Sequence, residues 1–114
     1  MNDPIYEGWY NRDLTPITSD ERLIAAAEPE NKRVAETRVG DLGWVSTVFL
    51  RLDHSFTEEG PPILFETLVF DGKLDGDMER YCTEEEALAG HYRMVERVRK
   101  TASLWGRFKA WLER

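Results

Sequence analysis

The chain has 114 residues, of which 41% are hydrophobic and 32% are charged, and its formal net charge is −7. These values are typical of one globular domain and exclude a disordered chain. No apolar run approaches the roughly 20 residues that span a bilayer, and the first residues lack the features of a secretory signal. A single cysteine, Cys82, excludes an internal disulfide and favours a reducing, cytoplasmic location.

Charge is unevenly distributed along the chain. Residues 91–114 carry seven basic and two acidic side chains, a net +5, so the remaining residues sum to −12. An acidic body would repel phosphates, which argues against general nucleic-acid binding. Helix polarity explains most of the asymmetry, because acidic residues favour the start of a helix and basic residues its later turns.

The first part of the chain, residues 1–32, is predicted to be irregular apart from one short helix. Thr18 and Glu21 have the spacing of a capping box, which predicts that a helix covers residues 19–28. Pro29 ends this helix, because the residue before a proline is disfavoured in helical geometry.

Residues 33–82 have the alternation and the turn residues of an antiparallel β-meander. Glycine and aspartate mark tight turns around residues 40–43 and 71–77. In the first strand, Val34 is expected on one face and Thr37 on the other, because successive side chains alternate. The four predicted strands cover residues 33–39, 44–52, 63–70 and 78–82.

Residues 83–112 are predicted to form one long helix. Thr83 and Glu86 are placed for reciprocal capping at its start, and Gly90 weakens it by about 1 kcal/mol relative to alanine. Apolar residues and one histidine recur at helical spacing: Ala87, His91, Met94, Val95, Val98, Ala102, Trp105, Phe108, Trp111 and Leu112. The predicted fold is therefore α+β, a single domain over residues 1–114. It combines a four-stranded antiparallel meander, a long C-terminal helix packed on one face and the short N-terminal helix.

The second and third strands are apolar on both faces. An antiparallel sheet with one face in water should instead alternate apolar and polar residues. We therefore expect the second face to be covered, either by another subunit or by the N-terminal segment that contains Tyr6, Trp9 and Tyr10.

Three residues are candidates for catalysis: His54, Glu66 and His91. A carboxylate in the apolar strand around Glu66 needs a partner, and Arg80 is the expected one, so a structural ion pair is the simpler explanation. His91 falls on the inward stripe of the helix, where a histidine is usually a core residue. Two imidazoles and a carboxylate can bind a metal. Closely spaced ligand pairs are absent, however, and so is a phosphate loop, so neither metal nor cofactor is expected.

Two surfaces are candidates for binding. The loop over residues 53–62 is longer than most hairpin loops, and long loops are more often functional, although Asp53 and Ser55 can also cap backbone amides there. The C-terminal end of the helix combines aromatic and basic residues, which suit the groove of a partner protein or a membrane surface. It is short and weakly charged for a membrane anchor, so protein contact is favoured. The residues expected to contribute to binding are Asp53, His54, Phe56, Arg80, Trp105, Phe108 and Trp111.

Several short motifs resemble those of a family of uncharacterised small proteins of actinobacteria and their bacteriophages. The resemblance covers about residues 33–98 and includes Leu52-Asp53-His54-Ser55-Phe56, Pro61-Pro62, Phe65-Glu66-Thr67, Arg80-Tyr81 and Gly90-His91. Members of that family have glycine at the position of Arg51 and serine at that of Cys82. The resemblance implies a phage or mobile-element setting and no particular chemistry.

Together these patterns predict a small cytoplasmic protein that binds or regulates a host protein, or associates with a second copy of itself. The alternative is a small enzyme, a hydrolase or a nucleotide-acting one, that uses His54, Glu66 and His91. That alternative requires the three side chains to converge in one cleft.

Overall fold

The computed structural model describes residues 8–17, 32–55, 57 and 59–112; for residues 103–110 it describes the backbone but not the side chains. Its elements are β1 (Arg33–Arg38), β2 (Trp44–Phe49), β3 (Phe65–Phe70), β4 (Met78–Tyr81) and α2 (Glu84–Leu112). The helix predicted over residues 19–28 lies outside the described residues.

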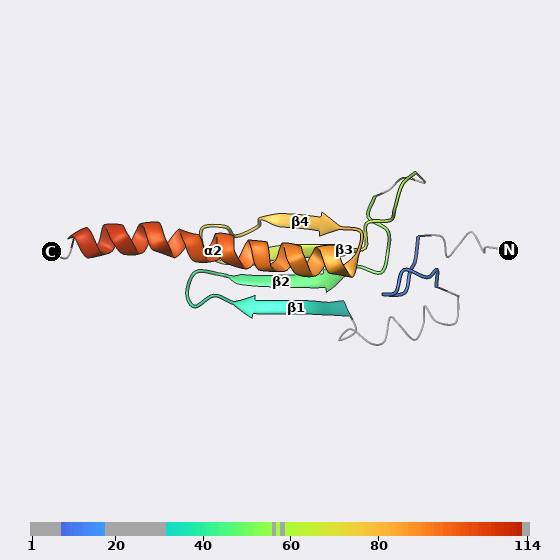
Figure 1. The fold of residues 1–114 in the computed structure, drawn as a ribbon, viewed down its shortest axis with the longest axis horizontal. Helices are drawn as coiled ribbons and strands as arrows, with labels where there is room; N and C mark the ends of the chain where they lie inside the picture. The colour runs from blue at the N-terminus through green and yellow to red at the C-terminus, as the bar shows by residue number, and fades with distance from the viewer. Residues whose placement is uncertain (1–7, 18–31, 56, 58, 113–114) are drawn as a thin grey trace.

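The strands form one antiparallel sheet in the order β1-β2-β3-β4, with α2 across one face (Figure 1). This confirms the predicted α+β fold with a four-stranded meander and a long C-terminal helix. The tight turns meet at one end of the sheet. A Cβ on Gly72 would lie 1.8 Å from the carbonyl oxygen of Leu42, so only glycine fits between these turns.

The strands differ from the prediction in their ends and in the register of β1. All four are shorter than predicted, and β2 is shortened most. β2 ends at Phe49, three residues earlier than expected, because Arg51 has a φ of 67° and turns the chain out of extended geometry. In β1 the register shifts between Arg33 and Ala35, which is a β-bulge. The bulge brings Val34 against the core on the helix side, whereas strict alternation predicted opposite faces for Val34 and Thr37.

The core lies between α2 and the sheet in two clusters of buried side chains. The first consists of Val45, Val69, Met94, Val95 and Val98, and the second of Phe49, Leu64, Phe65, Tyr81 and Ala87. At the start of α2, the Thr83 hydroxyl accepts the amide of Glu86 and donates to its carboxylate. The Thr83 half of the predicted capping therefore forms, with the Glu86 carboxylate bound to the Thr83 hydroxyl, and it anchors the helix over the second cluster.

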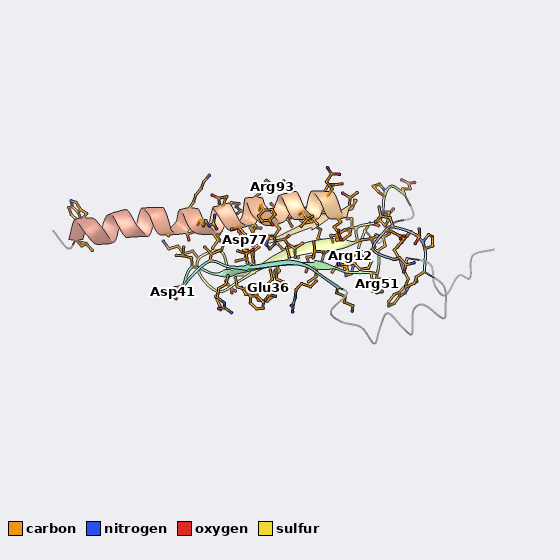
Figure 2. All side chains as sticks on the ribbon, turned by 60° about the horizontal axis from the view of Figure 1, so that its bottom comes forward. Arg12, Glu36, Asp41, Arg51, Asp77 and Arg93 are labelled. Atoms are coloured by element: carbon orange, nitrogen blue, oxygen red, sulfur yellow. The ribbon has the colours of Figure 1, made fainter. Side chains whose placement is uncertain are left out.

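The other face of the sheet is half-exposed and partly apolar. Trp44 packs against Phe70 across the strands, with 4.9 Å between ring centroids, and Phe70 and Met78 are exposed. No described element covers this face (Figure 2). Tyr10, which was expected to cover this face, packs instead against the second core cluster, and Trp9 forms a β-bridge with Leu52 beyond the end of β2. Tyr6 lies outside the described residues, and a covering subunit stays a prediction.

Helix α2 is much longer than the sheet that it covers. Its 29 residues span about 43 Å at 1.5 Å per residue, whereas a six-residue strand spans about 20 Å. The C-terminal part of the helix therefore extends past the tight-turn end of the sheet (Figure 1). Among the described residues, no helix combines the length and the apolar character that crossing a bilayer requires.

Candidate functional site

The three candidate catalytic residues lie in different parts of the molecule. His91 faces the helix side of the sheet, where it contacts Thr37 and Thr47. Glu66 is paired in register with Val48 and lies on the opposite face. The structure therefore does not bring these two groups into one cleft, which the enzymatic alternative requires.

The expected ion pair of Glu66 is confirmed. Arg80 is its register partner on β4 and donates through Nε to the Glu66 carboxylate at 3.0 Å. The Glu66 side chain is 17% exposed and that of Arg80 is 36% exposed. A half-exposed pair of this kind stabilises the fold only modestly, and here it satisfies a carboxylate on an otherwise apolar strand.

Asp53 and His54 organise the loop that follows β2. The Asp53 carboxylate accepts the amides of Ser55 and Ile63, both at 2.8 Å, which matches the capping explanation. Partial burial raises the pKa of Asp53, but these hydrogen bonds and the nearby His54 outweigh it, so the pKa lies below its ordinary value. The His54 Nδ1 lies 2.6 Å from the carbonyl oxygen of Leu52. Phe56, the remaining loop candidate, lies outside the described residues.

A row of polar side chains crosses the core beneath α2. His91 is fully buried, with its Nε2 2.8 Å from the Thr37 hydroxyl and its Nδ1 2.7 Å from the Thr47 hydroxyl. The Thr47 and Thr67 hydroxyls, directly opposite each other on β2 and β3, lie 2.5 Å apart. The row therefore joins the helix to three strands.

The row continues to the surface on β4. Beside Thr67, the Tyr81 hydroxyl donates to the Glu79 carboxylate at 2.8 Å. Glu79 in turn lies 3.6 Å from the guanidinium of Arg93 and 3.9 Å from that of Arg97, both on α2. Burial, more than the neighbouring carboxylate, raises the pKa of Tyr81 to about 12, so its hydroxyl keeps its proton.

The carboxylate of Glu79 favours one direction for the hydrogen bonds of this row. A carboxylate only accepts, so Tyr81 donates to it and its oxygen can accept from the neighbouring Thr67. With Thr67 donating toward Tyr81, we expect Thr47 to donate to Thr67 and Nδ1–H of His91 to donate to Thr47, because each hydroxyl has one proton. The Nε2 of a neutral His91 would then accept from Thr37. We refer to Thr37, His91, Thr47, Thr67, Tyr81 and Glu79 as the polar row.

Gly90 makes room for the polar row. A Cβ at this position would lie 2.1 Å from the Tyr81 hydroxyl and 2.3 Å from two of its ring atoms. The glycine that weakens the helix in isolation therefore allows Tyr81 to pack under it and to reach Glu79. Sequence reasoning treated Gly90 only as a weak point, because its role depends on a strand neighbour that is distant in the chain.

The polar row has the properties of a structural element. His91, Thr47 and Thr67 have no exposed surface, so no described surface gives a substrate access to them. Burial lowers the pKa of His91, which keeps the imidazole neutral and able to accept from Thr37. A fully satisfied buried network fixes the position of the helix on the sheet.

The first test of the polar row is its response to pH. Because the pKa of His91 is lowered in the folded state, the unfolded chain binds an extra proton as the pH falls below about 6.5. The contribution of His91 to stability is therefore present above that pH and decreases below it. Imidazole ¹⁵N shifts should report the neutral Nδ1–H tautomer at pH 7. A ring that carries its hydrogen on Nε2 would contradict the derived direction.

The candidate binding end of α2 is partly described. Trp111 and Leu112 are 68% and 60% exposed. Trp105 and Phe108 lie within residues 103–110, whose side chains are not described. Where the helix leaves the sheet, Leu42, Gly72 and Thr101 contribute to a mostly apolar hollow of about 300 Å³, with Asp41 and Lys73 at its wall. This hollow lies at the base of the extended part of the helix.

Among the described residues, no group of three or more histidine, cysteine, aspartate or glutamate side chains is arranged to bind a metal ion. Comparison with known proteins returned no matching family model, no matching curated protein and no matching solved structure. The resemblance to small proteins of actinobacteria and their bacteriophages therefore stays a prediction.

Proposed function

We propose that this chain is a protein-binding module whose contact surface is the end of α2 that extends past the sheet. The supporting observation is the exposure of Trp111 and Leu112 on a helix that has no sheet beneath its last turns. Exposed tryptophan at the centre of an interface is a common source of binding energy. The role as a regulator of a host protein, in a phage or mobile-element setting and in the cytoplasm, belongs to this proposal.

Sequence pattern and charge indicate the kind of groove that would accept this end of the helix. Trp105, Phe108 and Leu112 recur at helical spacing, and Arg107 and Lys109 interrupt them. A helix of this type docks by its apolar face into an apolar groove, and its basic residues favour carboxylates on the rim. The hollow beside Thr101 offers the same partner a second contact.

The test is affinity capture with the full chain, identification of the captured protein, and binding measurements with that protein in purified form. The double variant Trp111→Ala/Leu112→Ala should bind it about 30-fold more weakly, the effect of losing about 2 kcal/mol at a hot spot. Tyr92→Ala is the matched control, because Tyr92 is 62% exposed on the same helix where it overlies the sheet. The control should bind as the unchanged chain does.

Equal affinity of the double variant and the control would contradict the proposal. Sedimentation of the purified chain separates the two kinds of partner that the sequence left open. A second copy would appear as a dimer that the double variant dissociates, whereas a host protein would bind a monomer.

A further inference from the structure

Arg51 is a buried cation whose charge is not balanced within the described part of the chain. The residue is only 7% exposed, and its Nε is fully buried with no hydrogen-bond partner. None of the ion pairs between described residues includes it. The buried Nε–H has lost hydration that no acceptor among the described residues replaces, and such burial is costly.

The backbone of Arg51 is strained as well. Its φ of 67° lies in the left-handed region, which side chains with a Cβ rarely adopt. Strain of this kind persists where the surroundings over-determine the conformation, and it is concentrated at functional sites. At Arg51 the strain coincides with an unsatisfied buried donor, and the two are independent observations.

The surroundings hold the guanidinium in a defined position. Its Cζ lies 5.2 Å from the centroid of the Phe49 ring. The ring covers one face of the guanidinium plane, and it does not accept hydrogen bonds from the N–H groups at the edge of that plane. The Arg51 carbonyl accepts the amide of Tyr10 at 2.8 Å, and the Asp53 amide donates to the carbonyl of Gly8 at 2.7 Å. The backbone at Arg51 and at Asp53 is therefore hydrogen-bonded to residues 8–10.

The nearest carboxylate along the chain is already engaged. Asp53 accepts the amides of Ser55 and Ile63 through the same oxygen, Oδ1, and it forms no ion pair with Arg51. The described residues therefore supply no acceptor for the Nε–H of Arg51.

We propose that Arg51 is the centre of an oxyanion-binding site, which takes a carboxylate or a phosphate group on the edge of its guanidinium. The planar fork of arginine matches both groups through paired N–H···O bonds. The chain as a whole is acidic, so the proposed binding depends on the guanidinium of Arg51 itself and not on long-range attraction. The site lies at the loop end of β2 and is independent of the contact proposed for the end of α2.

The experiment is a titration of the full chain at constant ionic strength with inorganic phosphate in one arm and acetate in the other. The probe is the ¹H–¹⁵N resonance of each arginine Nε–H. The Arg51 resonance should move to saturation, while those of the exposed Arg93 and Arg97 should stay in place. Saturation with phosphate alone assigns a phosphate ligand, and saturation with acetate as well assigns a carboxylate, including one on a protein.

Two variants complete the test, and both are compared with Arg93→Gln, a surface control. Arg51→Lys keeps the charge but loses the fork, and Arg51→Gly removes the charge while suiting the left-handed backbone, so it should fold. Binding is then followed by the rise in thermal midpoint with added anion. Both variants should bind at least tenfold more weakly, and Arg93→Gln should bind normally.

An unmoved Arg51 resonance in both arms would overturn the proposal, as would equal, non-saturating shifts at all arginines. It would also fail if folded Arg51→Gly gained as much thermal stability from the anion as the unchanged chain. The variant Trp111→Ala/Leu112→Ala should bind the anion normally, so this test and that of the proposed function fail separately.

Discussion

Replacing His91 with leucine should lower the free energy of unfolding by about 3 kcal/mol. The substitution removes the ring that joins Thr37 to Thr47. The part-buried Thr37 hydroxyl then loses its partner, and the fully buried Thr47 hydroxyl keeps only Thr67. A buried polar group that loses its hydrogen bond retains its full desolvation cost, about 1–3 kcal/mol for each group. Urea unfolding of the two proteins measures the difference.

The control for this prediction removes the whole set of partners. In Thr37→Val/Thr47→Val/Thr67→Val/His91→Leu the hydroxyls are absent, so much of the loss should be recovered, because an apolar replacement of both partners is nearly neutral. If the single His91→Leu variant were as stable as the unchanged chain, the polar row would not be a structural network.

Gly90→Ala should lower stability by about 2 kcal/mol, although alanine favours a helix by about 1 kcal/mol over glycine. The added methyl group would lie within 2.3 Å of the ring and hydroxyl of Tyr81. That side chain cannot withdraw freely, because it is buried and donates to Glu79. Thermal or urea unfolding measures the loss.

A double variant separates this clash from any effect on the helix itself. In a background of Tyr81→Ala, which is already destabilised, Gly90→Ala should become neutral or stabilising, because the opposing ring is absent. A loss that remained unchanged in that background would show that the contact with Tyr81 is not its cause.

Much of the fold could be predicted from local patterns. The glycine and aspartate turns, the capping pair Thr83 and Glu86, and the partner of Glu66 all depend on neighbours in sequence or on strand order, and they are found where expected. The early end of β2 was not predicted, because an arginine gives no sequence signal for left-handed geometry. The cover expected from Tyr10 was also wrong, because the apolar pattern of a sequence does not say which face of the sheet a tyrosine joins.

The polar row was only partly visible in the sequence. His91 was expected on the inward stripe of the helix. Its contacts with Thr37 and Thr47, and the pair of Thr47 and Thr67, were not predicted, because they depend on the register of the strands and on the rotation of α2 about its axis. Threonines at three inward strand positions opposite a helical histidine were the available signal.

The direction of the polar row has a consequence for how a surface residue acts at a distance. In the expected orientation, one half-exposed carboxylate on β4, Glu79, sets which ring nitrogen of the buried His91 imidazole carries hydrogen. An amide at this position could donate as well as accept hydrogen bonds, and the row of hydroxyls would then no longer have a single orientation. A residue near the surface thus influences the tautomer of a fully buried imidazole.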